Sequence, residues 1–151
     1  MKCIGMLYTK YFPTVSAYWI ISIFHRTSTK KMNEVRIKVM KGYKDDKASD
    51  EYYLLKKFNW LLFKNPEDED KYGRLFDVER ERKYNSHFKS YMNYYDLRKK
   101  LLEINNDLTI CYSLKLELVD FYSKSTIDNA KVNLEKLIRS CIDTNLSLIH
   151  I

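Results

Sequence analysis

The sequence predicts a mainly α-helical fold, with a short N-terminal β-strand followed by about five helices in an irregular bundle. Glycine and proline are scarce, with 3 and 2 residues among 151, whereas an all-β chain of this length needs many tight turns. Apolar residues recur at spacings of three and four, the period of an amphipathic helix. The glycine clusters of Rossmann and P-loop sites are absent from the sequence.

A strand is the first element that the sequence predicts. Between Val15 and Phe24 the chain is rich in Val, Ile, Tyr and Trp, which favours a buried strand. Lys10 and Pro13 interrupt the apolar N-terminus, and the run that follows is too short to cross a bilayer. A membrane-associated protein anchored by residues 15–24 is therefore the weakest functional hypothesis, and we expect no membrane partner.

Five helices are expected after this strand. The first covers about 28–42, and the second runs from a cap at Ser49 to about Phe63, where Asn65-Pro66 stops it. The others are expected at about 94–104 after an Asn93 cap, at 108–123 after an Asp107 cap, and at 126–142 behind a capping box at 125–128. The inward faces of these helices are expected to include Met32, Val35, Val39, Tyr43, Leu54, Leu55, Phe58, Leu61, Leu62, Leu97, Leu101, Ile104, Leu108, Cys111, Tyr112, Leu118, Val119, Tyr122, Ala130, Leu134, Leu137, Ile138 and Cys141. Lys115 lies on the same stripe, and its charged head is expected to reach water.

Residues 66–92 show the least regular pattern. The stretch Glu67–Asp70 is expected to be a solvated loop. Basic residues interleaved with aromatic ones follow it, namely Arg80, Arg82, Lys83 and Lys89 among Tyr84, His87, Phe88 and Tyr91. Such a mixture can track a nucleic-acid backbone and stack on bases. It is also typical of an irregular connector packed by its own aromatic rings, so both interpretations stay open.

Positive charge is concentrated near the N-terminus. Residues 1–44 hold nine Lys or Arg and one Glu, whereas the rest of the chain is nearly balanced, and the net charge is +7. A local basic surface predicts a polyanionic partner, although a solvating face explains it equally well. The candidate DNA-binding residues are Lys30, Lys31, Arg36, Lys38 and Lys41 in the first helix, and Arg80, Arg82 and Lys83 in the segment 66–92.

The spacing of the cysteines and histidines does not predict a structural metal site. The three cysteines, Cys3, Cys111 and Cys141, form no paired motif, which argues against disulfides and zinc. Buried thiols in a reducing cytoplasm are the expectation. The three histidines lie in different segments without ligand spacing, so no metal site is predicted from them.

The order of several blocks resembles that of one known family. They are Ile20 to His25, KKMNEVRIKVMKGY (30–43), EYYLLKKFNWLLF (51–63), YMNYYDLRKKLL (91–102) and LTICYSLKLELVDFYSKSTIDNA (108–130). In order and spacing they are similar to insertion-sequence DDE transposases of the ISL-three group, over about residues 18–143. The resemblance divides the chain into 1–25 with a core-strand remnant, a helical region at 26–143, and a tail at 144–151.

The resemblance implies an RNase H-like enzyme that binds Mg²⁺ through three carboxylates and has a long helical insertion before the last of them. The family pattern at the end of the second catalytic strand is Asp-x-Phe-His. Phe24 and His25 match this pattern, but Ser22 stands at the Asp position, and a neutral hydroxyl does not replace a metal-binding carboxylate. The first Asp would precede Met1, and the Glu would follow Ile151.

The expectation is therefore a truncated transposase fragment from a broken gene, with DNA as its partner and no intact catalytic residue or cofactor of its own. Such a chain would be inactive alone. The alternative is a small basic helical module that binds nucleic acid and has no enzymatic activity.

Overall fold

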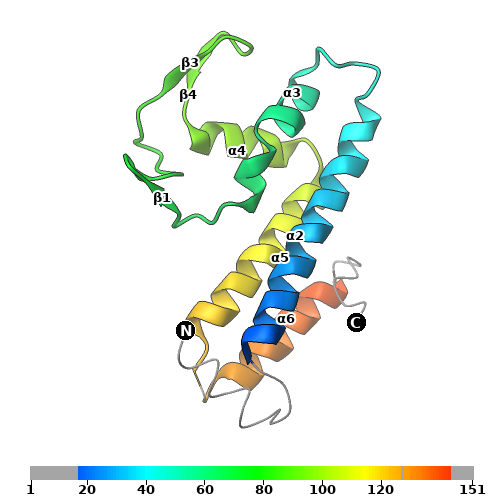
Figure 1. Ribbon diagram of the computed structural model, residues 1–151, viewed down its shortest axis with the longest axis vertical. Helices are drawn as coiled ribbons and strands as arrows, with labels where there is room; N and C mark the ends of the chain where they lie inside the picture. The colour runs from blue at the N-terminus through cyan, green and yellow to red at the C-terminus, as the bar shows by residue number, and fades with distance from the viewer. Residues whose placement is uncertain (1–16, 127, 144–151) are drawn as a thin grey trace. The chain divides into compact units, whose positions relative to one another are not determined.

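The computed structural model describes residues 17–126 and 128–143, and they are mainly helical (Figure 1). The mainly α prediction is therefore confirmed. Contacts divide the described chain into two compact units, one made of residues 32–109 and the other of the residues before and after that range. The elements are α2 (Ala17–Gly42), α3 (Asp50–Lys57), the 3-10 helix η1 (Asn59–Phe63), β1 (Glu69–Asp70), β2 (Gly73–Arg74), β3 (Lys83–Asn85), β4 (Ser90–Met92), α4 (Tyr94–Glu103), α5 (Asn106–Lys124) and α6 (Ala130–Asp143).

The expected N-terminal strand is not seen, because residues 17–24 form the first turns of α2. Val15 and Ser16 lie outside the described residues. A short apolar run is compatible with either a strand or a helix. A helix pairs its backbone groups within itself, whereas a strand needs a neighbour. The strands in the described part of the chain pair only in two short hairpins.

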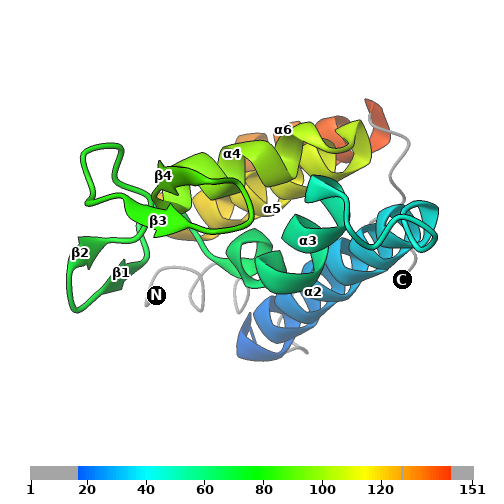
Figure 2. The same ribbon diagram turned by 90° about the horizontal axis from the view of Figure 1, so that it is seen from above.

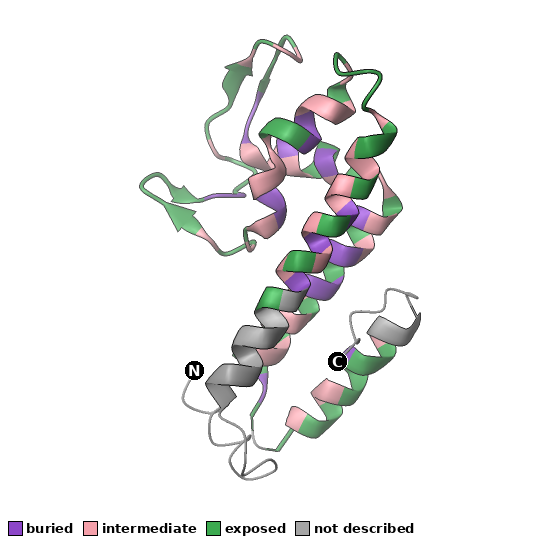
Figure 3. Ribbon diagram, turned by 45° about the vertical axis from the view of Figure 1, so that its right-hand side comes forward, coloured by how far each residue is buried: buried purple, intermediate pink, exposed green. Residues whose placement is uncertain are grey.

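The unit 32–109 has the main apolar core of the described residues, shown in purple along α2, α3 and α4 in Figure 3. Ser49 caps α3 as predicted, since its side chain accepts a hydrogen bond from the backbone N–H of Tyr52. The second predicted helix is divided at Phe58, where the backbone leaves helical geometry and η1 begins. Several side chains that were predicted to face inward are fully buried, namely Met32, Leu55, Leu61, Leu62, Leu101 and Leu108.

Two short antiparallel hairpins occupy part of the segment whose sequence pattern is least regular (Figure 2). In the first, Asp70 pairs with Gly73, whose φ of +98° explains the glycine at this position. The acidic stretch is therefore not wholly a loop, because Glu69 and Asp70 form β1. In the second hairpin, Tyr84 lies opposite Tyr91. Strands of two or three residues leave too few positions for a period-two pattern to show in the sequence.

The second unit contains most of α5 and the whole of α6. The Cys111 side chain is buried and forms no disulfide, as predicted, whereas Cys3 and the side chain of Cys141 lie outside the described part of the chain. Lys115 is only 6% exposed, although its charged head was expected to reach water. Ile138 was expected inward but is 38% exposed.

The predicted starts of the last two helices need correction. Asn105 caps α5 in place of Asp107, because its side-chain oxygen accepts from the Asp107 N–H at 2.8 Å. α6 begins at Ala130, after a turn in which the Thr126 N–H donates to the Asn129 side chain. At each of these turns, the side-chain amide oxygen of an Asn accepts a backbone hydrogen bond, where an Asp carboxylate was expected to do so. Within the described residues, no helix is both long and apolar enough to cross a bilayer.

Candidate nucleic-acid interface

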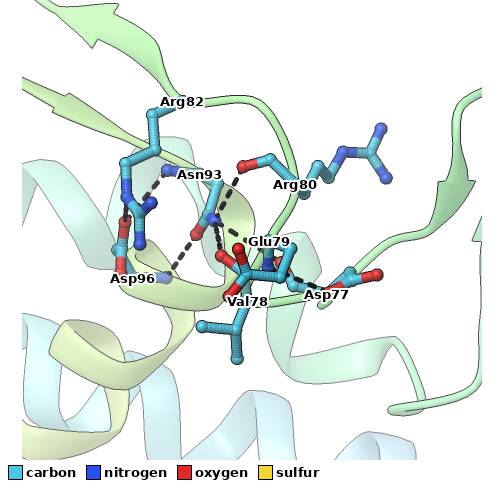
Figure 4. Close-up of polar contacts among 7 residues, drawn as sticks. All are labelled: Asp77, Val78, Glu79, Arg80, Arg82, Asn93 and Asp96. Atoms are coloured by element: carbon cyan, nitrogen blue, oxygen red, sulfur yellow. Dashed lines mark hydrogen bonds and ion pairs between the residues drawn. The ribbon is translucent and has the colours of Figure 1, made fainter.

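Asn93 joins the loop between the hairpins to the start of α4 (Figure 4). Its side-chain amide donates to the carbonyl oxygens of Val78 at 3.1 Å and Arg80 at 3.2 Å, with a longer contact to Asp77. Its side-chain oxygen accepts from the Asp96 N–H, and the Asp96 carboxylate accepts from the Asn93 N–H, which completes a capping box. Asn93 is 4% exposed. A buried amide without hydrogen-bond partners would destabilise the folded chain, and these bonds supply the partners.

Two arginines of the segment 66–92 are held by carboxylates. Arg80 donates to Asp70 at 2.6 Å and to the carbonyl oxygen of Arg74 at 3.0 Å, and its side chain is 12% exposed. The Arg82 Nε lies 3.1 Å from the Asp96 carboxylate. These contacts fix β1, the inter-hairpin loop and α4 against one another, so both arginines position the hairpins.

The ionisation of Asp70 is coupled to the same contacts. The hydrogen bond from the Arg80 guanidinium, together with one from the Tyr72 N–H, holds the pKa of the Asp70 carboxyl below its ordinary value. Both donors favour the charged form of the carboxylate. Asp70 is therefore bound as an anion by its own hairpin and by Arg80.

A pocket of about 790 Å³ lies within the unit 32–109, between the two hairpins and the α3 and α4 helices. Tyr72 and Gly73 line it from the first hairpin, and Lys83 and Tyr84 line it from the second. Its volume falls in the range of sites that accept small organic molecules. Its wall carries charges of both signs, from Lys57, Arg74, Arg80, Lys83, Asp70, Asp77, Glu79 and Glu81.

Both hairpins carry exposed lysines and tyrosines. The Lys71 and Lys83 ammonium groups lie 4.6 Å and 5.7 Å from the centre of the Tyr72 ring. The rings of Tyr84 and Tyr91 meet edge to face, with centres 5.4 Å apart. We name this set of exposed side chains the hairpin surface, and its members are Lys71, Tyr72, Lys83, Tyr84, Lys89 and Tyr91.

The candidate residues of the first predicted helix are spread along α2 and divided between the two units, and none of them lines the pocket beside the hairpin surface. Arg36 is bound inside the unit 32–109, since it donates to the Leu55 carbonyl oxygen at 3.1 Å and to Asn33. Lys38 is 80% exposed, with its Nζ 3.8 Å from the Asp107 carboxylate. Lys41 is exposed in the same unit, whereas Lys30 and Lys31 belong to the other unit.

Of the candidates at 80–83, only Lys83 belongs to the hairpin surface. Sequence reasoning missed Tyr72, because the two-residue strands that flank its turn leave no periodic signal. The Asp-Lys-Tyr-Gly sequence at 70–73 was the available signal, since a glycine after polar residues marks a turn.

The described residues do not fit a two-metal centre of the expected kind. Ser22 stands where the resemblance requires an Asp, and its backbone is helical as part of α2. The side chains of Ser22, Phe24 and His25 lie outside the description. Among the side chains that are described, no three carboxylate, histidine or cysteine groups gather closely enough to hold a metal ion.

Comparison with known proteins identifies the family. A family model described as Transposase, for the ISL-three group of DDE transposases, matches residues 7–150. No curated protein and no solved structure gives a significant match. The match covers nearly the whole chain and agrees with the resemblance carried by the blocks between residues 20 and 130. The chain therefore belongs to the ISL-three group of DDE transposases.

Proposed function

We propose that this chain contributes a DNA-binding helical region to transposition and does not itself carry out DNA cleavage or strand transfer. Membership of a transposase family makes DNA the expected partner. The observation that carries the proposal is the hairpin surface, which offers three lysines and three tyrosines on neighbouring hairpins. Lysines contact phosphates, and aromatic rings stack on bases.

The sequence at the position of the expected catalytic strand supports the proposal that the chain has no catalytic activity. DDE chemistry needs two divalent ions held by charged oxygen ligands. Ser22 supplies no charge at the position of the second carboxylate. The chain thus acts as a part of a transposase, in the bacterial cytoplasm where such an enzyme meets its DNA.

A salt titration of DNA binding tests the binding part. The purified chain is titrated into a labelled duplex, followed by fluorescence anisotropy, between about 50 and 200 mM salt. The affinity should fall steeply, and replacement of Lys71, Lys83 and Lys89 by Gln should reduce the log–log slope by about 0.9 for each phosphate that is no longer neutralised.

A matched control removes the same charge elsewhere. It replaces three exposed cations of α6, namely Lys131, Lys136 and Arg139, by Gln. This variant should keep the slope and the affinity closer to those of the wild type. An equal decrease in both triple variants would show that only net charge matters and would overturn the hairpin surface as the DNA contact.

A nicking assay tests the catalytic part. Supercoiled plasmid is incubated with the chain and Mg²⁺ or Mn²⁺, with and without a chelator. We expect no nicking above background. Metal-dependent nicking that co-purifies with the chain and is abolished by the chelator would refute the proposed inactivity.

A further inference from the structure

The tyrosines of the hairpin surface are largely exposed to solvent. Tyr72, Tyr84 and Tyr91 are 66%, 57% and 69% exposed. Single exposed aromatic residues are ordinary on protein surfaces. Here, however, Tyr72 and Tyr84 line one pocket from different hairpins, and Tyr91 contacts Tyr84. A cluster of exposed rings on neighbouring elements indicates a binding surface.

We propose that the hairpin surface binds single-stranded DNA in preference to duplex DNA, with unpaired bases stacked on the tyrosine rings. This inference rests on the proposed function, because it specifies which form of DNA the same surface takes. In a duplex the flat faces of the bases are covered by neighbouring base pairs. An unpaired base has a free face, and stacking on an aromatic ring does not depend on base identity.

The charges around these rings suit a stacked strand. Residues 82–92, which contain the second hairpin, carry three basic side chains and no Asp or Glu. The Lys71 and Lys83 ammonium groups lie over the Tyr72 ring at the distances given above, so a base that stacks on this ring displaces them from its face and leaves them within reach of its phosphates. The pocket of about 790 Å³ next to Tyr72 and Tyr84 has the volume for a nucleotide, but four carboxylates also line it, so the phosphates of a bound strand are expected at the lysines on its rim.

The second hairpin is held in one place before any ligand arrives. The His87 ring in its turn stacks on Tyr53 of α3, with centres 3.9 Å apart and planes within 7°. The His87 Nε2 also lies 2.9 Å from the Asp50 carboxylate at the start of α3. A surface that is ordered in advance loses less conformational entropy when it binds. The anchored turn therefore favours stacking on Tyr84 and Tyr91.

The test compares two forms of one DNA sequence with the full chain. Fluorescence anisotropy gives the affinity for a labelled strand of about 12 nucleotides, a length typical of single-strand sites, and for the same strand annealed to its complement. The wild-type chain should bind the single strand more tightly. The Y84A/Y91A variant should lose at least about fivefold in single-strand affinity, with little change for the duplex. Y84F/Y91F retains both rings and should bind as the wild type does.

Controls separate this inference from the proposed function. Val132→Ala removes an exposed apolar side chain on α6 and should leave both affinities unchanged. Y72A tests the first hairpin independently if the double variant does not fold, as judged by circular dichroism. Equal wild-type affinity for both DNA forms, or full single-strand binding by the folded alanine variants, overturns the single-strand preference and leaves the proposed function standing. Failure to bind either form overturns both.

Discussion

Arg80 holds Asp70 across the first hairpin, with the guanidinium Nη2 2.6 Å from the carboxylate oxygen Oδ2. Arg80 also donates to the carbonyl oxygen of Arg74 on β2. One side chain thus contacts both strands of the hairpin from the loop that precedes β3. The hairpin itself has only two residues in each strand, and such a short ribbon is marginal without outside contacts.

Acid should weaken this contact. The pKa of Asp70 is lowered in the folded chain by the Arg80 hydrogen bond, so the carboxylate stabilises the fold above its unfolded pKa of about 4. That contribution disappears as the pH falls through the folded pKa. The unfolding midpoint of D70N should therefore lie below that of the wild type at neutral pH, and the two should converge at low pH. E69Q on the same strand is the control; a constant gap between D70N and the wild type down to about pH 2 would contradict the assignment.

Removal of the Asn93 side chain should destabilise the unit 32–109 more than removal of an ordinary helix cap. Removal of a cap costs about 1 kcal/mol, and N93A also leaves the carbonyl oxygens of Val78 and Arg80 without their donor. We expect a decrease of about 2–4 kcal/mol in the free energy of unfolding, measured by urea denaturation.

Two variants separate the roles of Asn93. N93S keeps a capping oxygen but loses the amide donor, so it should fall between N93A and the wild type. S49A removes only the cap of α3 and should cost about 1 kcal/mol. If N93A costs no more than S49A, the bonds to the inter-hairpin loop contribute little.

Truncation of the buried leucines should identify the core. Leu55 and Leu101 are 0% exposed, and Leu→Ala at such sites costs about 2–5 kcal/mol through reduced burial and the cavity that remains. V132A, at a side chain 51% exposed, should change the free energy of unfolding by less than about 0.5 kcal/mol. Thermal melts followed by circular dichroism give these values if the transition is cooperative; similar small effects in all three variants would show that the core is not tightly packed.

Removal of charge from α2 should have little effect on folding. Lys38 pairs with Asp107 at 3.8 Å while 80% exposed, and exposed pairs contribute about 0–1 kcal/mol. K38Q/K41Q should therefore keep the stability of the wild type. If α2 also contacts phosphates, the salt slope of duplex binding should fall by about 0.9 per contact. An unchanged slope would restrict the DNA contact to other parts of the chain.

The presence of the helices was predictable from the sequence because their apolar residues recur at helical spacing, although α2 begins earlier than expected and the second predicted helix is divided at Phe58. Leu54, Leu55, Leu97 and Leu101 follow that pattern and are all buried. The caps at Ser49 and Asn93 were predictable for a local reason, since each side chain bonds to a backbone N–H three residues ahead. The start of α2 was predicted wrongly because its apolar run suits a strand equally well.

The candidate site was predictable only in part. Tyr84 and Tyr91 stood out as aromatic residues among basic ones, but their pairing depends on a register that the sequence does not display. Arg36 and Arg80 were chosen for their charge, whereas their partners, the Leu55 carbonyl oxygen and the Asp70 carboxylate, lie 19 and 10 residues away. Contacts at such separations arise from the tertiary fold.

The length of the turn in the second hairpin determines whether another family member can place two tyrosines as Tyr84 and Tyr91 are placed here. Lys89 adopts a left-handed backbone with φ of 50°, and the turn it belongs to sets Tyr84 opposite Tyr91. Because side chains alternate along a strand, one inserted or deleted residue in this turn would direct the two rings to opposite faces. We therefore expect turn length, more than the number of tyrosines and lysines, to mark the homologous chains that keep the proposed DNA-binding surface.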